Sequence, residues 1–466
     1  MTEKKKEMPL AIALIPIVFL IVALSFVIIV FKQTPHIPLI CAAAVAAAVA
    51  VFRKHRWKEI QEGMVHGITL AMGAILILMV IGTMIGTWIM GGVVPSMIYY
   101  GLKILSPGIF LIATLIVCSI VSLGTGSSWS TAGTVGVALI GVGRGLGIPV
   151  PMVAGAIISG AYFGDKMSPL SDTTNLAPAV AGTDVFTHVR HMIYTTGPGY
   201  AISLILYGLI GLKFAGGSLE TQNIETMLST MQDHFFIHPI LLLPPCLVIV
   251  MVIRRIPPLP ALLGGTAIGG LFAIATQSKS LADVIEAAFS GYVSKTGVVM
   301  VDGLLSRGGL MSMMETVALI ICALSFGGIM EKTGMLETIA AALLKRVKRT
   351  GTLVTTTILS CIGMNIIASD QYMAIVIPGR MYKSAFDEKR LHPKNLSRCL
   401  EDAGTLSSPL IPWNTCGAFM HATLGVNPLL YLPYAFLNLL TPLVSIFYGY
   451  TGITMEKVEE KEKIEL

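Results

Sequence analysis

The chain has 466 residues, of which 54% are hydrophobic and only 12% are charged, and its mean hydropathy is +0.78. Soluble domains carry about 25% charged residues, so this composition argues against a soluble enzyme and indicates a membrane protein. The net charge of +6 calls for no nucleic-acid partner, because Lys and Arg lie in short loops between apolar segments, where they orient membrane proteins.

Apolar runs of about 20 residues, enough to cross a bilayer, recur along the chain. The clearest cover residues 9–31, 68–90, 109–123 with their flanks, 192–212, 239–253 and 429–447. The first run is too long for a signal-peptide core and lacks a small-residue cleavage site, which favours a transmembrane helix over a secretory signal. We therefore expect an all-α polytopic protein of the cell membrane, surrounded by lipid.

Several function classes find no support in the sequence. It contains no nucleotide-binding P-loop, so transport driven directly by ATP in this chain is not expected. The seven cysteines are scattered and form no C-x-x-C pair, which predicts neither a cysteine metal site nor a disulfide framework. We expect no cofactor.

The second half of the chain repeats features of the first. GDKMSPL at 164–170 shares G-x-x-x-S-P-L with GTLSSPL at 404–410, at a spacing of 240 residues. Other short matches keep the same order and nearly the same spacing, which indicates an internal duplication. Upstream the spacing falls to 224, where Glu62 and Gly67 match Glu286 and Gly291, so we place about 16 extra residues of the second half within 301–316. We predict a cytoplasmic N-terminus over 1–8, a first transmembrane repeat over 9–215 and a polar connector over 216–237. A second repeat then covers 238–452, and a charged tail covers 453–466.

The basic loops predict the relative orientation of the two repeats. The basic loop RKHRWK at 53–58 corresponds to the weakly charged SKSLAD at 278–283, whereas LKILSPG at 102–108 corresponds to the strongly basic LLKRVKRTG at 343–351. Because basic loops face the cytoplasm, this exchange predicts inverted-topology repeats and a cytoplasmic N-terminus. Inverted repeats are typical of secondary transporters with a binding site near the bilayer midplane.

Polar segments interrupted by Gly or Pro stand out against this apolar background, two in each repeat. They are GTGSSWSTAGT at 124–134, GDKMSPLSDTTN at 164–175, GMNIIASDQYM at 363–373 and EDAGTLSSPLIPWNT at 401–415. Gly and Pro break helices, and the backbone groups freed in a membrane must line protein or a watery cavity. Carbonyl and hydroxyl oxygens suit a hard cation such as Na⁺.

Acidic residues lie in or beside these predicted breaks and are the candidates for Na⁺ binding and proton exchange: Asp165, Asp172, Asp370, Glu401 and Asp402. Carboxylates are costly inside a membrane, so their presence indicates function unless they lie at the interface or form structural ion pairs. For Asp165 the ion-pair alternative involves Lys166 or Arg380. We expect Na⁺ at Asp165, Asp172 and Asp370. The predicted ligand shell comprises Ser127, Ser128, Ser130, Ser168, Thr173, Thr174, Asn175, Ser369, Thr405, Ser408, Asn414 and Thr415.

These motifs resemble those of the NhaC-type sodium/proton antiporter family. The resemblance is carried by GDKMSPLSDTTNLAPAVAGTD at 164–184 and extends through 124–136, 370–382 and 401–417. It implies paired re-entrant hairpins with tips near 124–130 and 363–370, broken transmembrane helices at 165–175 and 405–415, and a homodimer.

We therefore predict a secondary active transporter, not an enzyme, that exchanges Na⁺ for H⁺ by alternating access. The resembling family also includes malate–proton/sodium–lactate antiporters, so Na⁺- and H⁺-coupled antiport of small organic acids stays open. In that alternative, Lys166 or Arg380 supplies positive charge to a carboxylate substrate, beside hydroxyl and amide donors of the predicted shell.

Overall fold

The computed structural model describes residues 8–31, 33–214, 219–344 and 349–458. Within these residues the chain is helical, and β pairing is limited to the isolated bridges Tyr292–Arg307 and Leu391–Lys457. Several predicted parts fall outside the described residues: positions 1–7 of the N-terminal segment, 216–218 of the connector, 345–348 of the second basic loop and 459–466 of the charged tail.

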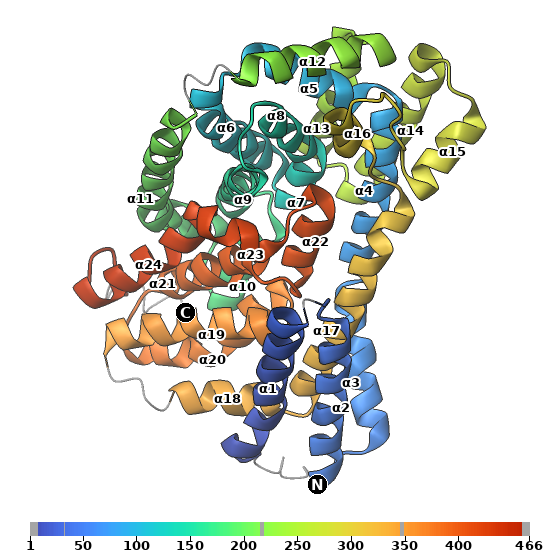
Figure 1. Cartoon of the computed structure of the whole chain (residues 1–466). Coiled ribbons are helices and arrows are strands. Elements are labelled where there is room, and N and C mark those ends of the chain that lie inside the picture. Colours follow the sequence, from blue (N-terminus) through green and yellow to red (C-terminus); the bar gives the residue numbers. More distant parts are fainter. Residues whose placement is uncertain (1–7, 32, 215–218, 345–348, 459–466) are drawn as a thin grey trace.

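The described part of the first half forms α1 to α11 (Figure 1). Their bounds are α1 (Leu10–Ser25), α2 (His36–Phe52), α3 (Trp57–Leu70), α4 (Met72–Met90), α5 (Val93–Ile104), α6 (Pro107–Thr125), α7 (Ser128–Thr131), α8 (Val137–Gly145), α9 (Val150–Met167), α10 (Asp172–Ala181) and α11 (Val185–Leu212). π-helical turns extend α1 over Phe26–Val30 and join α7 to α8 over Ala132–Gly136.

The remaining described residues form α12 to α24. Their bounds are α12 (Leu219–His234), α13 (Leu243–Ile253), α14 (Pro258–Gln277), α15 (Leu281–Ser290), α16 (Val299–Leu305), α17 (Met314–Lys332), α18 (Met335–Leu344), α19 (Thr350–Ile367), α20 (Gln371–Glu388), α21 (Pro393–Leu400), α22 (Thr415–Leu424), α23 (Pro428–Tyr431) and α24 (Phe436–Thr451). Short 3₁₀ turns lie at Pro239–Leu242, Leu310–Met313, Ser408–Leu410 and Leu432–Tyr434, and a π-helical turn covers Glu401–Thr405.

Seven helices in the described part are long and apolar enough to cross a membrane, or nine if each of two bent pairs is one span. This confirms a polytopic, multi-pass membrane protein. One predicted span differs in shape: residues 429–447 are not continuous, because Pro428–Tyr434 and Phe436–Thr451 meet at 61°. Pro433 lies in the 3₁₀ turn before this bend and has no backbone N–H to continue an α-helical ladder. The predicted polar connector contains a helix, α12.

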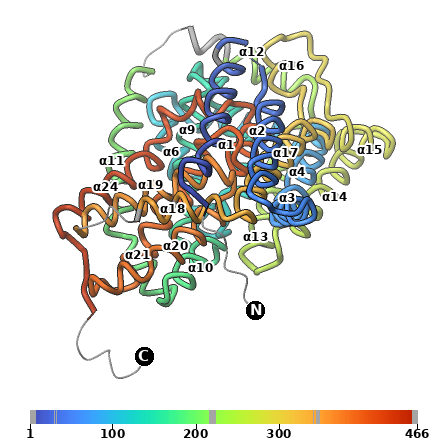
Figure 2. The backbone as a smooth tube through the Cα atoms, turned by 90° about the horizontal axis from the view of Figure 1, so that it is seen from below, coloured from blue at the N-terminus to red at the C-terminus, as the bar shows by residue number. Residues whose placement is uncertain are grey.

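Helices from the two halves of the chain pack against one another. α17 packs against α2 and α3, α14 packs against α4, α11 packs against α24, and α10 packs against α20. In both views α14 and α15 lie on one side of the molecule and α11 and α24 lie on the opposite side (Figures 1 and 2). The four predicted break segments come together between these sides, so the site is assembled from both halves.

Small residues permit the closest of these contacts. A Cβ atom at Gly160 would lie 2.4 Å from the carbonyl oxygen of Leu115, and one at Gly164 would lie 2.2 Å from the backbone nitrogen of Leu123. Only glycine therefore allows α9 to approach α6 this closely, which is a common packing device in membrane proteins. This contact fixes the end of α9 that bears Asp165.

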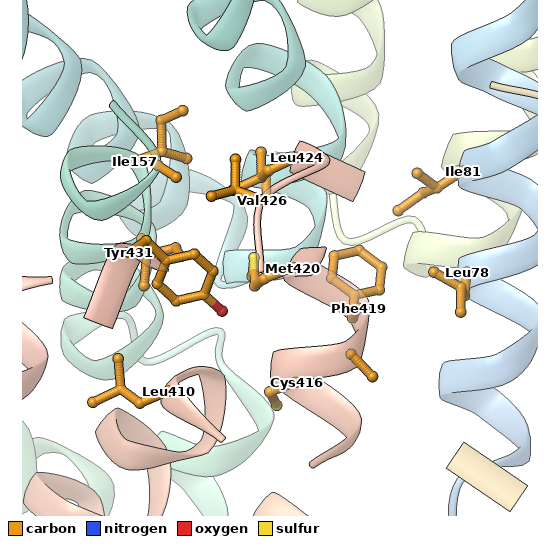
Figure 3. Close-up of a cluster of buried hydrophobic side chains, with 14 of the residues drawn as sticks. Leu78, Ile81, Ile157, Leu410, Cys416, Phe419, Met420, Leu424, Val426 and Tyr431 are labelled. Carbon is orange, nitrogen blue, oxygen red and sulfur yellow. The ribbon is translucent and has the colours of Figure 1, made fainter. Parts of the chain in front are cut away.

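A cluster of buried apolar side chains holds α22 between α9 and α4. In Figure 3, Phe419 of α22 points toward Leu78 and Ile81 of α4, and Leu424 lies on the side of Ile157 of α9. Trp129 stacks on Phe419 with ring centroids 3.9 Å apart. This packing sets the position of the N-terminal end of α22, which reaches the candidate site.

Candidate functional site

A cavity of about 620 Å³ lies where the four polar segments meet. Asp165, Asp172 and Asp370 all line it. One wall comes from the junction of α3 and α4 and from the α13–α14 connection, in residues 70–77 and 252–258. The sequence prediction that these three acids share one region is therefore consistent with their positions in the structure.

Each of the four polar segments interrupts a helix. α6 ends at Thr125, and Gly126 has a left-handed φ of 67° before α7 begins. α9 ends at Met167 and α10 begins at Asp172. In the second half, α19 ends at Ile367 before α20, and the turns after α21 end before α22. The predicted breaks at Gly- and Pro-containing sequences thus correspond to real interruptions of the helices.

The breaks contact one another in pairs. A Cβ atom at Gly126 would lie 2.7 Å from Leu170, so the first break crosses the second at a position that requires glycine. The backbone N–H of Thr415 donates to the carbonyl oxygen of Ser369 at 2.9 Å, which joins the fourth break to the third. Ser369 has a left-handed φ of 58°, an uncommon conformation for a residue with a side chain.

Asp165 is held by hydroxyl donors from two breaks. Ser128 Oγ donates to Asp165 Oδ2 at 2.6 Å, and Ser171 Oγ donates to Asp165 Oδ1 at 2.6 Å. The carboxylate is 7% exposed and faces the cavity. Thr173 also lines the cavity and contacts Ser171, with their hydroxyl oxygens 3.2 Å apart. Asp165 thus lies at the centre of a group of oxygen atoms suited to a hard cation.

Asp370 caps α20 and is buried at 3% exposure. Its Oδ1 accepts hydrogen bonds from the backbone N–H groups of Tyr372 at 2.9 Å and Met373 at 3.1 Å. Asp172 occupies the first turn of α10, is exposed, and lies 3.5 Å from the hydroxyl group of Tyr372. The positive ends of the α10 and α20 dipoles therefore partly offset these two carboxylates.

Lys166 faces away from the cavity although its neighbour Asp165 lines it. The Lys166 ammonium forms an ion pair with Asp402, and both side chains are fully buried. Thr195 of α11 donates a second hydrogen bond to Asp402 Oδ1 at 3.0 Å. Lys166 is therefore paired with Asp402 and not with Asp165.

Glu401 lies beside this ion pair, in the π-helical turn Glu401–Thr405. It is fully buried, and neither of its carboxylate oxygens has a hydrogen-bond partner within the described part of the chain. Glu401 and Asp402 do not line the cavity. They are two neighbouring buried acids outside its lining. π-helical turns such as the one that carries them often occur at functional sites.

The predicted ligand shell divides into residues that face the cavity and residues that shape the breaks. Ser127, Ser128, Thr173 and Thr415 line the cavity. The others lie outside its lining: Ser130, Ser168, Thr174, Asn175, Ser369, Thr405, Ser408 and Asn414.

Several of these outer residues have clear structural roles. Thr174 Oγ1 donates to the backbone oxygens of Asp165 and Lys166, at 3.0 and 2.8 Å. Asn414 accepts from the backbone N–H of Cys416 and caps α22. These contacts hold the backbone of the breaks and position the residues that line the cavity.

The positive charge at the cavity differs from the predicted one. Lys166 is buried in its ion pair, and Arg380 is exposed and outside the lining. Arg255 lines the cavity instead, together with the uncharged Gln371. Sequence reasoning missed Arg255 because the pair Arg254–Arg255 directly follows an apolar run and has the pattern of an ordinary basic loop. The Pro-Pro sequence after it is the only signal of a break there.

Within the described ranges, no three His, Cys, Asp or Glu side chains are close enough to hold a metal ion together.

Comparisons with known proteins identify the family of the chain. The profile of the Na⁺/H⁺ antiporter family matches residues 160–453. The chain is 40% identical over 456 residues to the Na⁺/H⁺ antiporter NhaC of Alkalihalophilus pseudofirmus OF4, covering 98% of each chain. It is 41% identical to the malate-2H⁺/Na⁺-lactate antiporter of Bacillus subtilis 168, covering 93% of each chain. It is 38% identical to the arginine/ornithine antiporter ArcD of Halobacterium salinarum, covering 97% of this chain and 94% of that protein. On the family match and these full-length similarities, the chain belongs to the Na⁺/H⁺ antiporter family.

Proposed function

We propose that this protein is a secondary active transporter that exchanges Na⁺ for H⁺ across the cell membrane by alternating access. The observation that carries the proposal is the set of three carboxylates, Asp165, Asp172 and Asp370, on one cavity formed by helix breaks. Carboxylates at such breaks can be neutralised either by a bound cation or by a proton, and competition between the two couples their fluxes.

In this proposal Na⁺ binds at Asp165, with hydroxyl oxygens of Ser128 and Ser171 nearby and with Asp172 and Asp370 on the same cavity. Hydrogen bonds to Asp165 already orient its carboxylate toward this space. Glu401 and Asp402 lie outside the cavity lining, and Asp402 is paired with Lys166, the residue that follows Asp165. In this proposal the three acids that line the cavity bind the ion, and the two acids outside the lining do not contact it.

The proposed architecture is a pair of inverted-topology repeats with a cytoplasmic N-terminus. The matching order of breaks in the two halves supports it: the α6–α7 break corresponds to α19–α20, and the α9–α10 break corresponds to α21–α22. The exchange of the basic loops between the repeats gives the orientation. A homodimer completes the proposal.

Proteoliposomes that hold the purified protein test the exchange directly. An imposed pH gradient should drive ²²Na⁺ uptake, and Asp165→Asn, Asp172→Asn or Asp370→Asn should each reduce it at least about tenfold. Asp387→Asn is the matched control, because Asp387 lies exposed on α20 outside the cavity and should leave uptake unchanged. Wild-type rates in all three cavity variants would exclude this ion site.

A second candidate is antiport of small organic acids coupled to Na⁺ and H⁺. The cavity volume of about 620 Å³ favours it, because a single water molecule takes up only about 30 Å³. A cavity of this size therefore accommodates a small organic molecule beside a cation. Counterflow of labelled L-malate or L-lactate in the same proteoliposomes separates the two candidates, since pure Na⁺/H⁺ exchange predicts no counterflow of either acid.

A further inference from the structure

Arg255 lies at the wall of the cavity, in the turn that ends α13. It follows the last turn of α13 with a left-handed φ of 64°, and its backbone N–H donates to the carbonyl oxygen of Val252 at 2.8 Å. Pro257 and Pro258 follow, and α14 begins at Pro258. The backbone N–H of Ile256 also donates to the carbonyl oxygen of Met251 at 3.0 Å, so a common helix-ending turn sets the backbone of Arg255, and its exposed side chain lines the cavity.

The guanidinium group of Arg255 has no protein partner among the residues that the structure describes. It forms no ion pair and no hydrogen bond there, although three carboxylates line the same cavity. Asp165 is bound by Ser128 and Ser171, and Asp370 is bound by backbone N–H groups. The five N–H donors of Arg255 therefore have no partner in the part of the chain that the structure describes, and their planar arrangement matches a carboxylate.

The charges of the cavity determine when such an anion can bind. With three ionised carboxylates and one guanidinium, the lining is net negative and repels an anion. Na⁺ or protons on the acids remove this repulsion and leave Arg255 as the uncompensated charge. Anion binding is thereby linked to cation binding, and each increases the affinity for the other.

We propose that Arg255 binds the carboxylate of a small organic anion that enters the cavity after Na⁺, so that both occupy the cavity in the same state. The inference rests on the proposed function, because Na⁺ at the acidic residues is what permits the anion to bind. It assigns the substrate-carboxylate contact to Arg255 and removes it from Lys166, whose ammonium is fully buried with Asp402.

The test measures binding of L-lactate and L-malate to the purified full-length protein by isothermal titration calorimetry, with and without Na⁺. We expect wild-type protein to bind at least one of the two acids more tightly when Na⁺ is present. Arg255→Asn should raise its Kd at least about tenfold, the size expected for a lost charge-assisted hydrogen bond. Asparagine is chosen because it tolerates a left-handed backbone.

Arg254→Asn is the matched control, because Arg254 is the adjacent exposed arginine and does not line the cavity. It should leave the Kd of the acid unchanged. Equal affinities in wild type and Arg255→Asn, or equal losses in both arginine variants, would overturn the proposal. The proposal also fails if wild-type protein binds neither acid in Na⁺ while it still exchanges Na⁺ for H⁺. Absence of Na⁺/H⁺ exchange in wild type would instead refute the proposed function itself.

A labelling experiment on the wild-type protein needs no variant to fold. Phenylglyoxal, an arginine-selective reagent, should modify both exposed arginines, Arg254 and Arg255. The acid that binds, added with Na⁺, should protect Arg255 and leave Arg254 reactive, as read by peptide mass spectrometry. Unchanged labelling of Arg255 under these conditions would also overturn the proposal.

Discussion

Removing either member of the buried Lys166–Asp402 ion pair should strongly destabilise the protein. Both side chains are fully buried, so each single replacement leaves one charge without its partner in the protein interior. Lys166→Met leaves Asp402 with the hydrogen bond from Thr195, while its Oδ2 has no partner among the described residues. Asp402→Asn keeps an acceptor for Thr195 but leaves the Lys166 ammonium without a counter-charge.

The expected size follows from this burial. Replacing one partner of a buried ion pair lowers the free energy of unfolding by about 3–5 kcal/mol. An exposed ion pair contributes only about 0–1 kcal/mol to that free energy. The double variant Lys166→Met/Asp402→Asn contains neither charge and retains an acceptor for Thr195. We therefore expect it to be more stable than either single variant, which requires a coupling energy above about 3 kcal/mol between the two sites.

The assay is unfolding of the purified protein in mild-detergent micelles by increasing sodium dodecyl sulfate, followed by circular dichroism. The exposed pair Lys332–Glu62, with an N–O distance of 3.7 Å, provides the comparison through Lys332→Met and Glu62→Gln. Losses below about 1 kcal/mol in both buried variants, equal to those of the exposed pair, would refute the reasoning. A double variant that is less stable than both single variants would also refute the reasoning.

Two further predictions use paired substitutions. Asp370→Asn should keep the α20 cap and leave the unfolding free energy within about 0.5 kcal/mol of wild type while Na⁺ uptake falls, whereas Asp370→Ala should also lose about 0.5–2 kcal/mol of stability. Equal destabilisation by both would contradict a separate ion-binding role. Gly164→Ala should cost about 1–3 kcal/mol in the same unfolding assay, because its Cβ would meet the Leu123 backbone nitrogen at 2.2 Å. Gly363→Ala, with no atom within 4 Å of the new Cβ, should instead stabilise α19 by up to about 1 kcal/mol, and a loss there would contradict the packing argument.

Much of the helical pattern could be predicted from local sequence. Apolar runs near residues 9–31, 68–90 and 109–123 became α1, α4 and α6, because length and hydropathy alone decide whether a segment can cross a bilayer. The breaks at Gly126 and at Ser168–Ser171 follow from local backbone preferences of glycine and proline. The bend at Ala435 was missed, since a single proline near a helix end does not fix where the chain turns.

Hydropathy and helix-breaking residues alone indicate a multi-pass membrane protein with polar helix breaks that carry Asp165, Asp172 and Asp370. Which charged side chains face the cavity depends on the packing of the helices against one another. Asp165 and Lys166 are adjacent, yet successive residues of a helix point about 100° apart, so the packing of α9 directs one to the cavity and the other to Asp402. Arg255 reaches the same cavity from a distant loop, because long-range packing of α13 and α14 places it there.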